Sequence, residues 1–129
     1  NKSDVAMLVP ADCVEVVKNA VLEIVKHAGP NPCPPIVLGI GIGGTMDQAA
    51  VMSKKALLRD ISVPHKDADY AKLEEEIMEM VNKTGIGPQL GGTTTCIGVN
   101  IEWGATHIAG LPVAVTIMCH AARHAHVVL

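Results

Sequence analysis

The residues best suited to metal chemistry lie near the C-terminus, where Cys119 and His120 are followed by Arg123, His124 and His126. Thiolates and imidazoles are the ligands that zinc and other transition metals take in proteins. In a helix, residues 120 and 124 would share one face, because side chains four positions apart lie above one another. The segment therefore permits a metal site, and the alternative is a polar segment that binds nothing.

A second candidate is the glycine-rich stretch 39–45, in which Gly39, Gly41 and Gly44 satisfy the pattern G-x-G-x-x-G. Backbone N–H groups at the start of a helix can hold a phosphate or a carboxylate. A dinucleotide fold also needs an acidic residue about 20 positions further on, at the end of a second strand. Asp60 has that offset, but little strand sequence adjoins it. The pattern therefore favours a tight turn required by packing over a nucleotide site.

His107 is a third candidate, because it lies in the stretch 106–112, which carries no charged residue. A histidine in such surroundings can donate a hydrogen bond to a ligand or titrate near neutral pH. The alternative is a structural histidine whose hydrogen bonds are satisfied within the fold. The residue types leave both interpretations open.

The four cysteines stand far apart, at positions 13, 33, 96 and 119. Without a C-x-x-C pair they form no zinc or redox motif. No signal peptide is visible, so we expect free thiols in a reducing, cytoplasmic compartment. The simplest expectation for each cysteine is a small buried hydrophobic residue. Cys33 has a distinctive setting, because four prolines in the segment 30–35 hold the chain extended around it.

Three helices that could position these residues are indicated by hydrophobic periodicity. Apolar residues recur at the three/four spacing of a helix over residues 11–28 and 67–83. Thr45 and Gln48 form a capping-box pattern that predicts a helix over residues 46–58. The acidic cluster in the third helix lies mostly off its apolar stripe and is predicted to be a solvated face; it consists of Glu74, Glu75, Glu76 and Glu79.

The strands complete the expected fold. A continuous apolar run at 36–42 predicts a strand covered on both faces. Alternating apolar residues predict two more strands, around 96–103 and 113–117, the second leading to Cys119. We therefore expect one α/β segment over residues 1–129, with a mixed sheet flanked by helices and an incomplete domain; the alternative class is α+β.

Composition limits the possible partners. The chain has 129 residues, 49% of them hydrophobic, and a net charge of -3. A negative charge argues against nucleic-acid binding, and no apolar run approaches the roughly 20 residues of a membrane span. Between residues 84 and 129 only Glu102 and Arg123 are fully charged. We expect this half to be buried in a larger domain or against a partner.

Five segments of the chain carry a family resemblance when they are taken together. The segments are Pro32-Cys33-Pro34-Pro35, Gly41-Ile42-Gly43-Gly44-Thr45, Gly85-Ile86-Gly87-Pro88-Gln89-Leu90-Gly91-Gly92, Thr106-His107-Ile108-Ala109-Gly110-Leu111-Pro112-Val113 and Cys119-His120-Ala121-Ala122-Arg123-His124. In order and approximate spacing they resemble the class I, iron–sulfur fumarate hydratases and the closely related L(+)-tartrate dehydratases. The resemblance covers nearly the whole chain, and the set of segments is more specific than any one of them.

The resemblance implies the later part of the family's alpha subunit, or N-terminal catalytic domain. The chain begins at Asn1 without a methionine, so we expect an excised piece. The family binds a [4Fe–4S] cluster through three cysteines; by resemblance Cys33 and Cys119 are two of them, and the third lies outside this chain. Cys13 and Cys96 do not match ligand positions and are expected to be structural.

The same resemblance implies the chemistry, which is reversible hydration of fumarate to (S)-malate with the open iron as Lewis acid. His107 matches a histidine that contacts the dicarboxylate substrate, while the general base is expected outside this sequence. The expected partners are a beta subunit or C-terminal domain, in a dimer of the assembled enzyme, and the isolated chain is expected to be inactive. The alternatives are L(+)-tartrate dehydratase and, for a protein that is not an enzyme, a zinc-binding module built on Cys119, His120 and His124.

Overall fold

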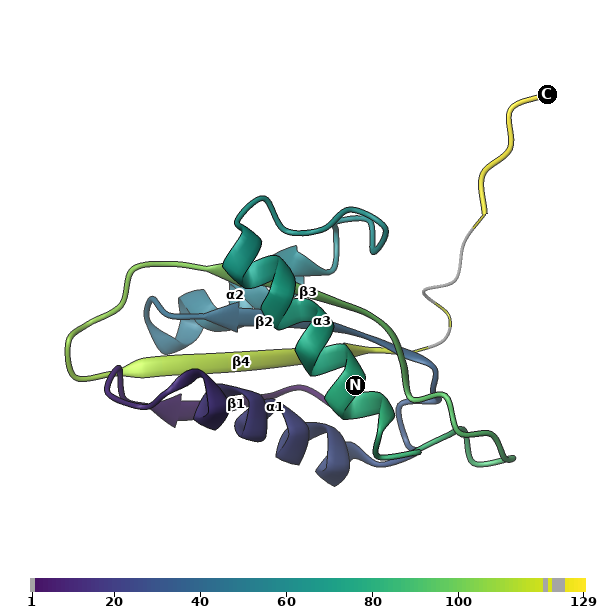
Figure 1. The fold of residues 1–129 in the computed structure, drawn as a ribbon, viewed down its shortest axis with the longest axis horizontal. Helices are drawn as coiled ribbons and strands as arrows, with labels where there is room; N and C mark the ends of the chain where they lie inside the picture. The colour runs from purple at the N-terminus through teal and green to yellow at the C-terminus, as the bar shows by residue number, and fades with distance from the viewer. Residues whose placement is uncertain (1, 120, 122–124) are drawn as a thin grey trace.

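The computed structural model of the chain describes residues 2–119, 121 and 125–129. Within these residues, four strands form one sheet and three helices pack against it (Figure 1). The elements along the chain are β1 (Asp4–Leu8), α1 (Val14–Ala28), β2 (Ile36–Ile42), α2 (Met46–Ala56), α3 (Ala68–Asn82), β3 (Cys96–Trp103) and β4 (Leu111–Met118).

The sheet is mixed, with the strand order β1-β4-β2-β3. β2 and β3 run parallel, whereas β4 runs antiparallel to both of its neighbours, β1 and β2. The start of β2 therefore lies beside the end of β4, and the end of β2 lies beside the start of β4. This arrangement confirms the expected α/β class with a mixed sheet.

The helices cover the sheet unequally. α2 packs on one face, while α1 and α3 pack side by side on the other (Figure 1). Every residue of β2 is buried, as the continuous apolar run predicts for a strand with helices on both faces. β3 is also buried on both faces over most of its length, because α3 covers one side and α2 the other. Its alternating sequence therefore does not produce alternating exposure.

The predicted helices are confirmed, with ends that differ by no more than three residues. The capping box is present at the start of α2, where the backbone N–H of Thr45 donates to Oε1 of Gln48 at 3.0 Å. β1 was not predicted from the sequence, because its five residues are too few for a periodic pattern. β1 forms only by pairing with β4.

One charged residue of α3 is not where the sequence analysis placed it. Glu74 was predicted to lie on a solvated face, but it is only 6% exposed. Its carboxylate pairs with the guanidinium of Arg59 and accepts hydrogen bonds from the backbone N–H groups of Ile101, at 2.8 Å, and His65, at 3.2 Å. The prediction was wrong because these partners come from β3 and the α2–α3 loop, which helical periodicity does not describe.

We predict that Glu74→Ala lowers the free energy of unfolding by about 3 kcal/mol, because it removes the carboxylate that pairs with the part-buried guanidinium of Arg59 and leaves a backbone donor of β3 without its acceptor. Glu75→Ala is the matched control, since the neighbouring side chain is exposed. Urea unfolding of both variants measures the difference. Equal losses in the two variants would show that the buried pair does not stabilise this fold.

Candidate functional site

Cys33 and Cys119 lie at the same end of the sheet. Val37 of β2 is paired with Met118 of β4, and Cys119 directly follows Met118. Cys33 precedes the first residue of β2, Ile36, by three positions. The antiparallel pairing of β2 with β4 thus places two residues that are 86 positions apart in the sequence at the same end of the sheet. We call this edge of the sheet the cysteine end.

Cys33 is held in an unusual backbone conformation. Its φ angle is 59°, a region that residues other than glycine rarely adopt. Its N–H donates to the carbonyl of Pro30 at 3.1 Å, and its exposed Sγ lies 3.7 Å from the carbonyl oxygen of Asn31, to which the thiol can donate. Such backbone conformations persist where the surroundings enforce them and cluster at functional sites. The proline-rich segment therefore presents this thiol to solvent.

A second loop joins the cysteine end. β3 begins at Cys96, which is paired with Ile36 at the start of β2, so the segment 84–95 reaches the sheet beside the Cys33 loop. The side-chain amide of Gln89 donates to Oδ1 of Asn31 at 3.5 Å. From the sequence, Gln89 is only part of a motif and Asn31 has no predicted role. Only the strand pairing shows that the two residues meet.

The other two cysteines do not share this position. Cys96 is buried, and burial raises the pKa of its thiol to about 11. Cys13 is exposed at the N-cap of α1, after the end of β1, which lies beside the start of β4 at the opposite end of the sheet. The expectation that all four cysteines are buried is wrong for Cys13 and Cys33. Cys119 is half-buried.

His107 lies away from the cysteine end. It belongs to the loop 104–110, which connects the end of β3 to the start of β4. Its side chain is exposed, and Nδ1 accepts a hydrogen bond from the N–H of Ala109 at 3.1 Å. The eight residues of β4 separate this loop from Cys119, a length of roughly 23 Å for an extended strand. The chain therefore does not bring His107 and the two cysteines into one site.

The glycine-rich turn 43–45 lies at the same end as His107, and its backbone donors are already used. The N–H groups of Gly43 and Gly44 donate to the carbonyls of Pro112 and Ala105, at 2.9 and 3.1 Å. The carboxylate of Asp47 lies at the N-terminus of α2, where hydrogen bonds from Thr45 and from the backbone hold its pKa below its usual value. A negative side chain thus occupies the position that a phosphate would need.

The first two glycines of the pattern serve packing. A Cβ atom on Gly39 would lie 2.1 Å from the carbonyl oxygen of Ser53, and one on Gly41 would lie 2.0 Å from that of Ala49. Both oxygens belong to α2, so the glycines let this helix approach β2 closely. The interpretation as a packing turn is confirmed, and the dinucleotide interpretation is not supported.

We predict that Gly41→Ala lowers the free energy of unfolding by about 2 kcal/mol, because α2 must move away from β2 to admit the methyl group. Gly110→Ala is the control, since a Cβ there would meet nothing within 4 Å, and its effect should stay below roughly 0.5 kcal/mol. Thermal or urea unfolding measures both values. A neutral Gly41→Ala variant would mean that the close helix–strand contact is not needed.

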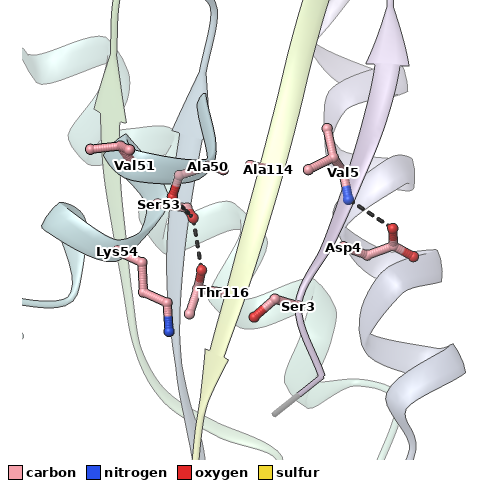
Figure 2. Close-up of a pocket in the computed structure, with 9 residues that line it drawn as sticks. All are labelled: Ser3, Asp4, Val5, Ala50, Val51, Ser53, Lys54, Ala114 and Thr116. Atoms are coloured by element: carbon pink, nitrogen blue, oxygen red, sulfur yellow. Dashed lines mark hydrogen bonds between the residues drawn. The ribbon is translucent and has the colours of Figure 1, made fainter. Parts of the chain in front are cut away.

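A groove lies between α2 and the strands β1 and β4 (Figure 2), and its residues do not form a catalytic or metal-binding arrangement. Its lining is mostly apolar or small. The hydroxyl of Ser53 donates to the carbonyl of Ala50 at 2.7 Å and lies 2.7 Å from the hydroxyl of Thr116, so its buried polar groups are partnered. None of the predicted site residues lines it; the lining residues are Ser3, Asp4, Val5, Ala50, Val51, Ser53, Lys54, Ala114 and Thr116.

Comparison with known proteins decides the family. A family model described as fumarate hydratase (Fumerase) matches residues 1–128. The chain belongs to the fumarate hydratase family. This assignment agrees with the resemblance of the five sequence segments.

The curated relatives that match this chain include alpha subunits of enzymes named L(+)-tartrate dehydratase. A Methanocaldococcus jannaschii protein named, provisionally, L(+)-tartrate dehydratase subunit alpha is 51% identical over 126 residues, which are 97% of this chain and 44% of that protein. The L(+)-tartrate dehydratase subunit alpha of Escherichia coli K12 is 40% identical over 118 residues, which are 91% of this chain and 39% of that protein. The chain thus spans less than half the length of the relatives it matches.

The cysteine end of this fumarate hydratase family chain fits part of a metal centre. Exposed and half-buried thiols are suitable donors for an iron–sulfur cluster, which prefers thiolate ligands. Among the residues that the structure describes, no three His, Cys, Asp or Glu side chains gather as they would around a metal ion. His120, Arg123 and His124, which the sequence analysis considered near Cys119, lie outside the described residues. The described residues therefore place two thiols at this end that could serve as ligands, and a complete centre would need more.

Proposed function

We propose that the chain is the C-terminal part of the alpha-subunit domain of a [4Fe–4S] hydro-lyase that hydrates fumarate reversibly to (S)-malate. The observation that carries the proposal is the position of Cys33 and Cys119 at one end of the sheet in a chain of the fumarate hydratase family. These two thiolates would hold two irons of the cluster, and a third cysteine outside the chain would complete the ligand set.

The chain's own residues would bind the cluster and fix its position. When bound, the cluster provides a Lewis-acidic iron that can polarise a hydroxyl group and a carboxylate of the substrate. Cys33 would be held toward the cluster by its fixed backbone, and Cys119 by the end of β4. A rigid support of this kind fixes the geometry of a metal site better than a free loop does. The general base would come from a part of the enzyme outside this chain.

The names of the relatives favour a second substrate, L(+)-tartrate, for the same centre. Fumarate hydration and tartrate dehydration both concern a small dicarboxylate and the loss or gain of water. Anaerobic assay of the assembled enzyme with fumarate, (S)-malate and L(+)-tartrate decides between them. Turnover of none of the three substrates by an iron-loaded enzyme would contradict the proposal.

We also propose that His107 contacts the substrate, but in the site of a second copy of the chain. Within one copy, β4 separates His107 from Cys119 by roughly 23 Å, and a small dicarboxylate cannot bridge that gap. A dimer in which the His107 loop of one copy faces the cysteine end of the other would complete both sites. The exposure of His107 and of its neighbour Ile108 is consistent with a surface that another chain covers.

The chain is proposed to act with a partner subunit in the cytoplasm. The alpha subunits named among the relatives support a beta subunit, or an equivalent C-terminal domain, as the partner of this chain. No helix in the described part of the chain is long and apolar enough to cross a membrane. We place the enzyme in the cytoplasm, where reducing conditions keep such thiols free.

A zinc-binding module is the alternative that metal analysis can exclude. It would use Cys119 with His120 and His124, and it would leave Cys33 without a role. Anaerobic reconstitution of the assembled enzyme should give a brown protein with about four irons per cluster site. A colourless protein with stoichiometric zinc would favour the module instead.

A further inference from the structure

We propose that Gln89 is a positioning residue, which holds the Cys33 thiol in its direction by way of Asn31. The amide of Gln89 donates to Oδ1 of Asn31 at 3.5 Å, and the backbone carbonyl of Asn31 accepts from the Cys33 thiol, with a separation of 3.7 Å. The purpose of this contact, orientation of a cluster ligand, rests on the function proposed above. The contact itself is a property of the chain alone.

Gln89 is carried by a loop whose base is fixed. We call residues 85–92 the strap. At its base, the hydroxyl of Thr84 donates to the carbonyl of Val81 at 2.7 Å and lies 3.5 Å from the hydroxyl of Thr95. The N–H of Ile86 donates to the same Thr84 oxygen, at 3.4 Å. The strap therefore begins and ends against the C-terminus of α3 and the start of β3, beside the Cys33 loop.

The two sides of the strap also touch each other. A Cβ atom on Gly87 would lie 1.8 Å from the carbonyl oxygen of Gly92, so the backbones cross in van der Waals contact. Gly91 and Gly92 have φ angles of 111° and 110°, which only glycine adopts readily. This closed shape brings Gln89 to the Cys33 loop, while the next residue, Leu90, is fully exposed. Gln89 is exposed as well, and its hydrogen bond to Asn31 is what distinguishes it from Leu90.

Cys33 needs such support, because its own backbone is strained. Its φ angle of 59° is unfavourable for a residue with a Cβ atom, and its side chain is exposed. The Pro30 carbonyl fixes the backbone N–H of Cys33, but only the Asn31 carbonyl restrains the thiol among the hydrogen bonds of the described residues. A residue that fixes Asn31 therefore also narrows the range of directions available to Sγ. Gln89 is the residue whose side chain contacts that of Asn31.

The test measures thiol alkylation in the 129-residue chain without iron. Iodoacetamide labelling, quantified for each cysteine by mass spectrometry, gives the rate at Cys33 relative to the exposed Cys13. Gln89→Met keeps the length of the side chain but removes the donor, and the ratio should rise about fivefold, as expected for the loss of one hydrogen bond. Leu90→Ala is the matched control and should leave the ratio unchanged. Cys96 should stay unlabelled in both variants, which shows that the fold is retained.

A double variant shows whether Gln89 affects the Cys33 thiol through Asn31 or by a general loosening of the loops around it. If Gln89 acts through Asn31, Gln89→Met combined with Asn31→Ala should raise the ratio no further than Asn31→Ala alone. An unchanged ratio in Gln89→Met, or additive effects in the double variant, would overturn the proposal.

The same measurement distinguishes this proposal from the proposed function. Should the ratio respond as expected while the reconstituted assembled enzyme binds no iron, the positioning stands and the hydro-lyase function falls. Should iron bind fully while the ratio stays constant, the function stands and the positioning role of Gln89 falls. Both outcomes are read without an activity assay.

Discussion

Cys33→Ser and Cys119→Ser are each expected to lower kcat/KM of the assembled enzyme by about a thousandfold or more, with loss of the iron. A serine hydroxyl is a much poorer ligand for iron–sulfur clusters than a thiolate. A metal centre that stabilises the transition state by several kcal/mol accounts for a loss of this size, since each 1.4 kcal/mol corresponds to a factor of about ten. Iron content and anaerobic hydration rates measure the two effects separately.

Cys13→Ser is the matched control, because it makes the same chemical change at the other end of the sheet. Cys13 is the N-cap of α1 and makes no capping hydrogen bond through its side chain. Serine is a preferred N-cap residue, so this variant should keep its iron and its activity and should unfold at the same temperature or slightly higher. Loss of iron in Cys13→Ser, or full iron in either of the other variants, would contradict the ligand assignment.

Local features of this fold could be predicted from the sequence. The all-apolar run of β2 and the Thr45–Gln48 capping box each depend on neighbouring residues, and both were found as predicted. The role of Gly41 in packing was also anticipated, although the atom that demands it, the carbonyl oxygen of Ala49, could not be named. In each case the signal lies within a few residues of the element it describes.

Features that depend on strand pairing could not be predicted. Nothing near Glu74 in the sequence indicates that β3 and Arg59 will surround its carboxylate. The meeting of Asn31 with Gln89 follows from the parallel pairing of β2 with β3, which joins distant segments. In the same way, the family resemblance grouped His107 with Cys119, twelve residues apart, and only the extended conformation of β4 shows that they lie at opposite ends of the sheet.

The separation of His107 from Cys119 predicts that two inactive variants restore activity when they form a dimer together. His107→Asn should remove activity when every copy carries it, as should Cys33→Ser. If the histidine of one copy serves the cysteine end of another, a dimer of one Cys33→Ser chain and one His107→Asn chain contains one intact site. Co-expression at equal levels, with random pairing, should then restore about a quarter of the wild-type activity, since half of the dimers are mixed and each has one working site of two.

Two controls make this complementation decisive. Mixing the two purified, pre-assembled variants without subunit exchange should restore nothing, because no mixed dimer forms. Co-expression of Cys33→Ser with Cys119→Ser should also restore nothing, because these two residues lie at the same end of one copy and each chain then lacks a ligand of its own site. Activity from the first pair and not from the second would place His107 across the subunit interface. No activity from either pair, in dimers shown to be mixed, would show that His107 does not act in the partner's site.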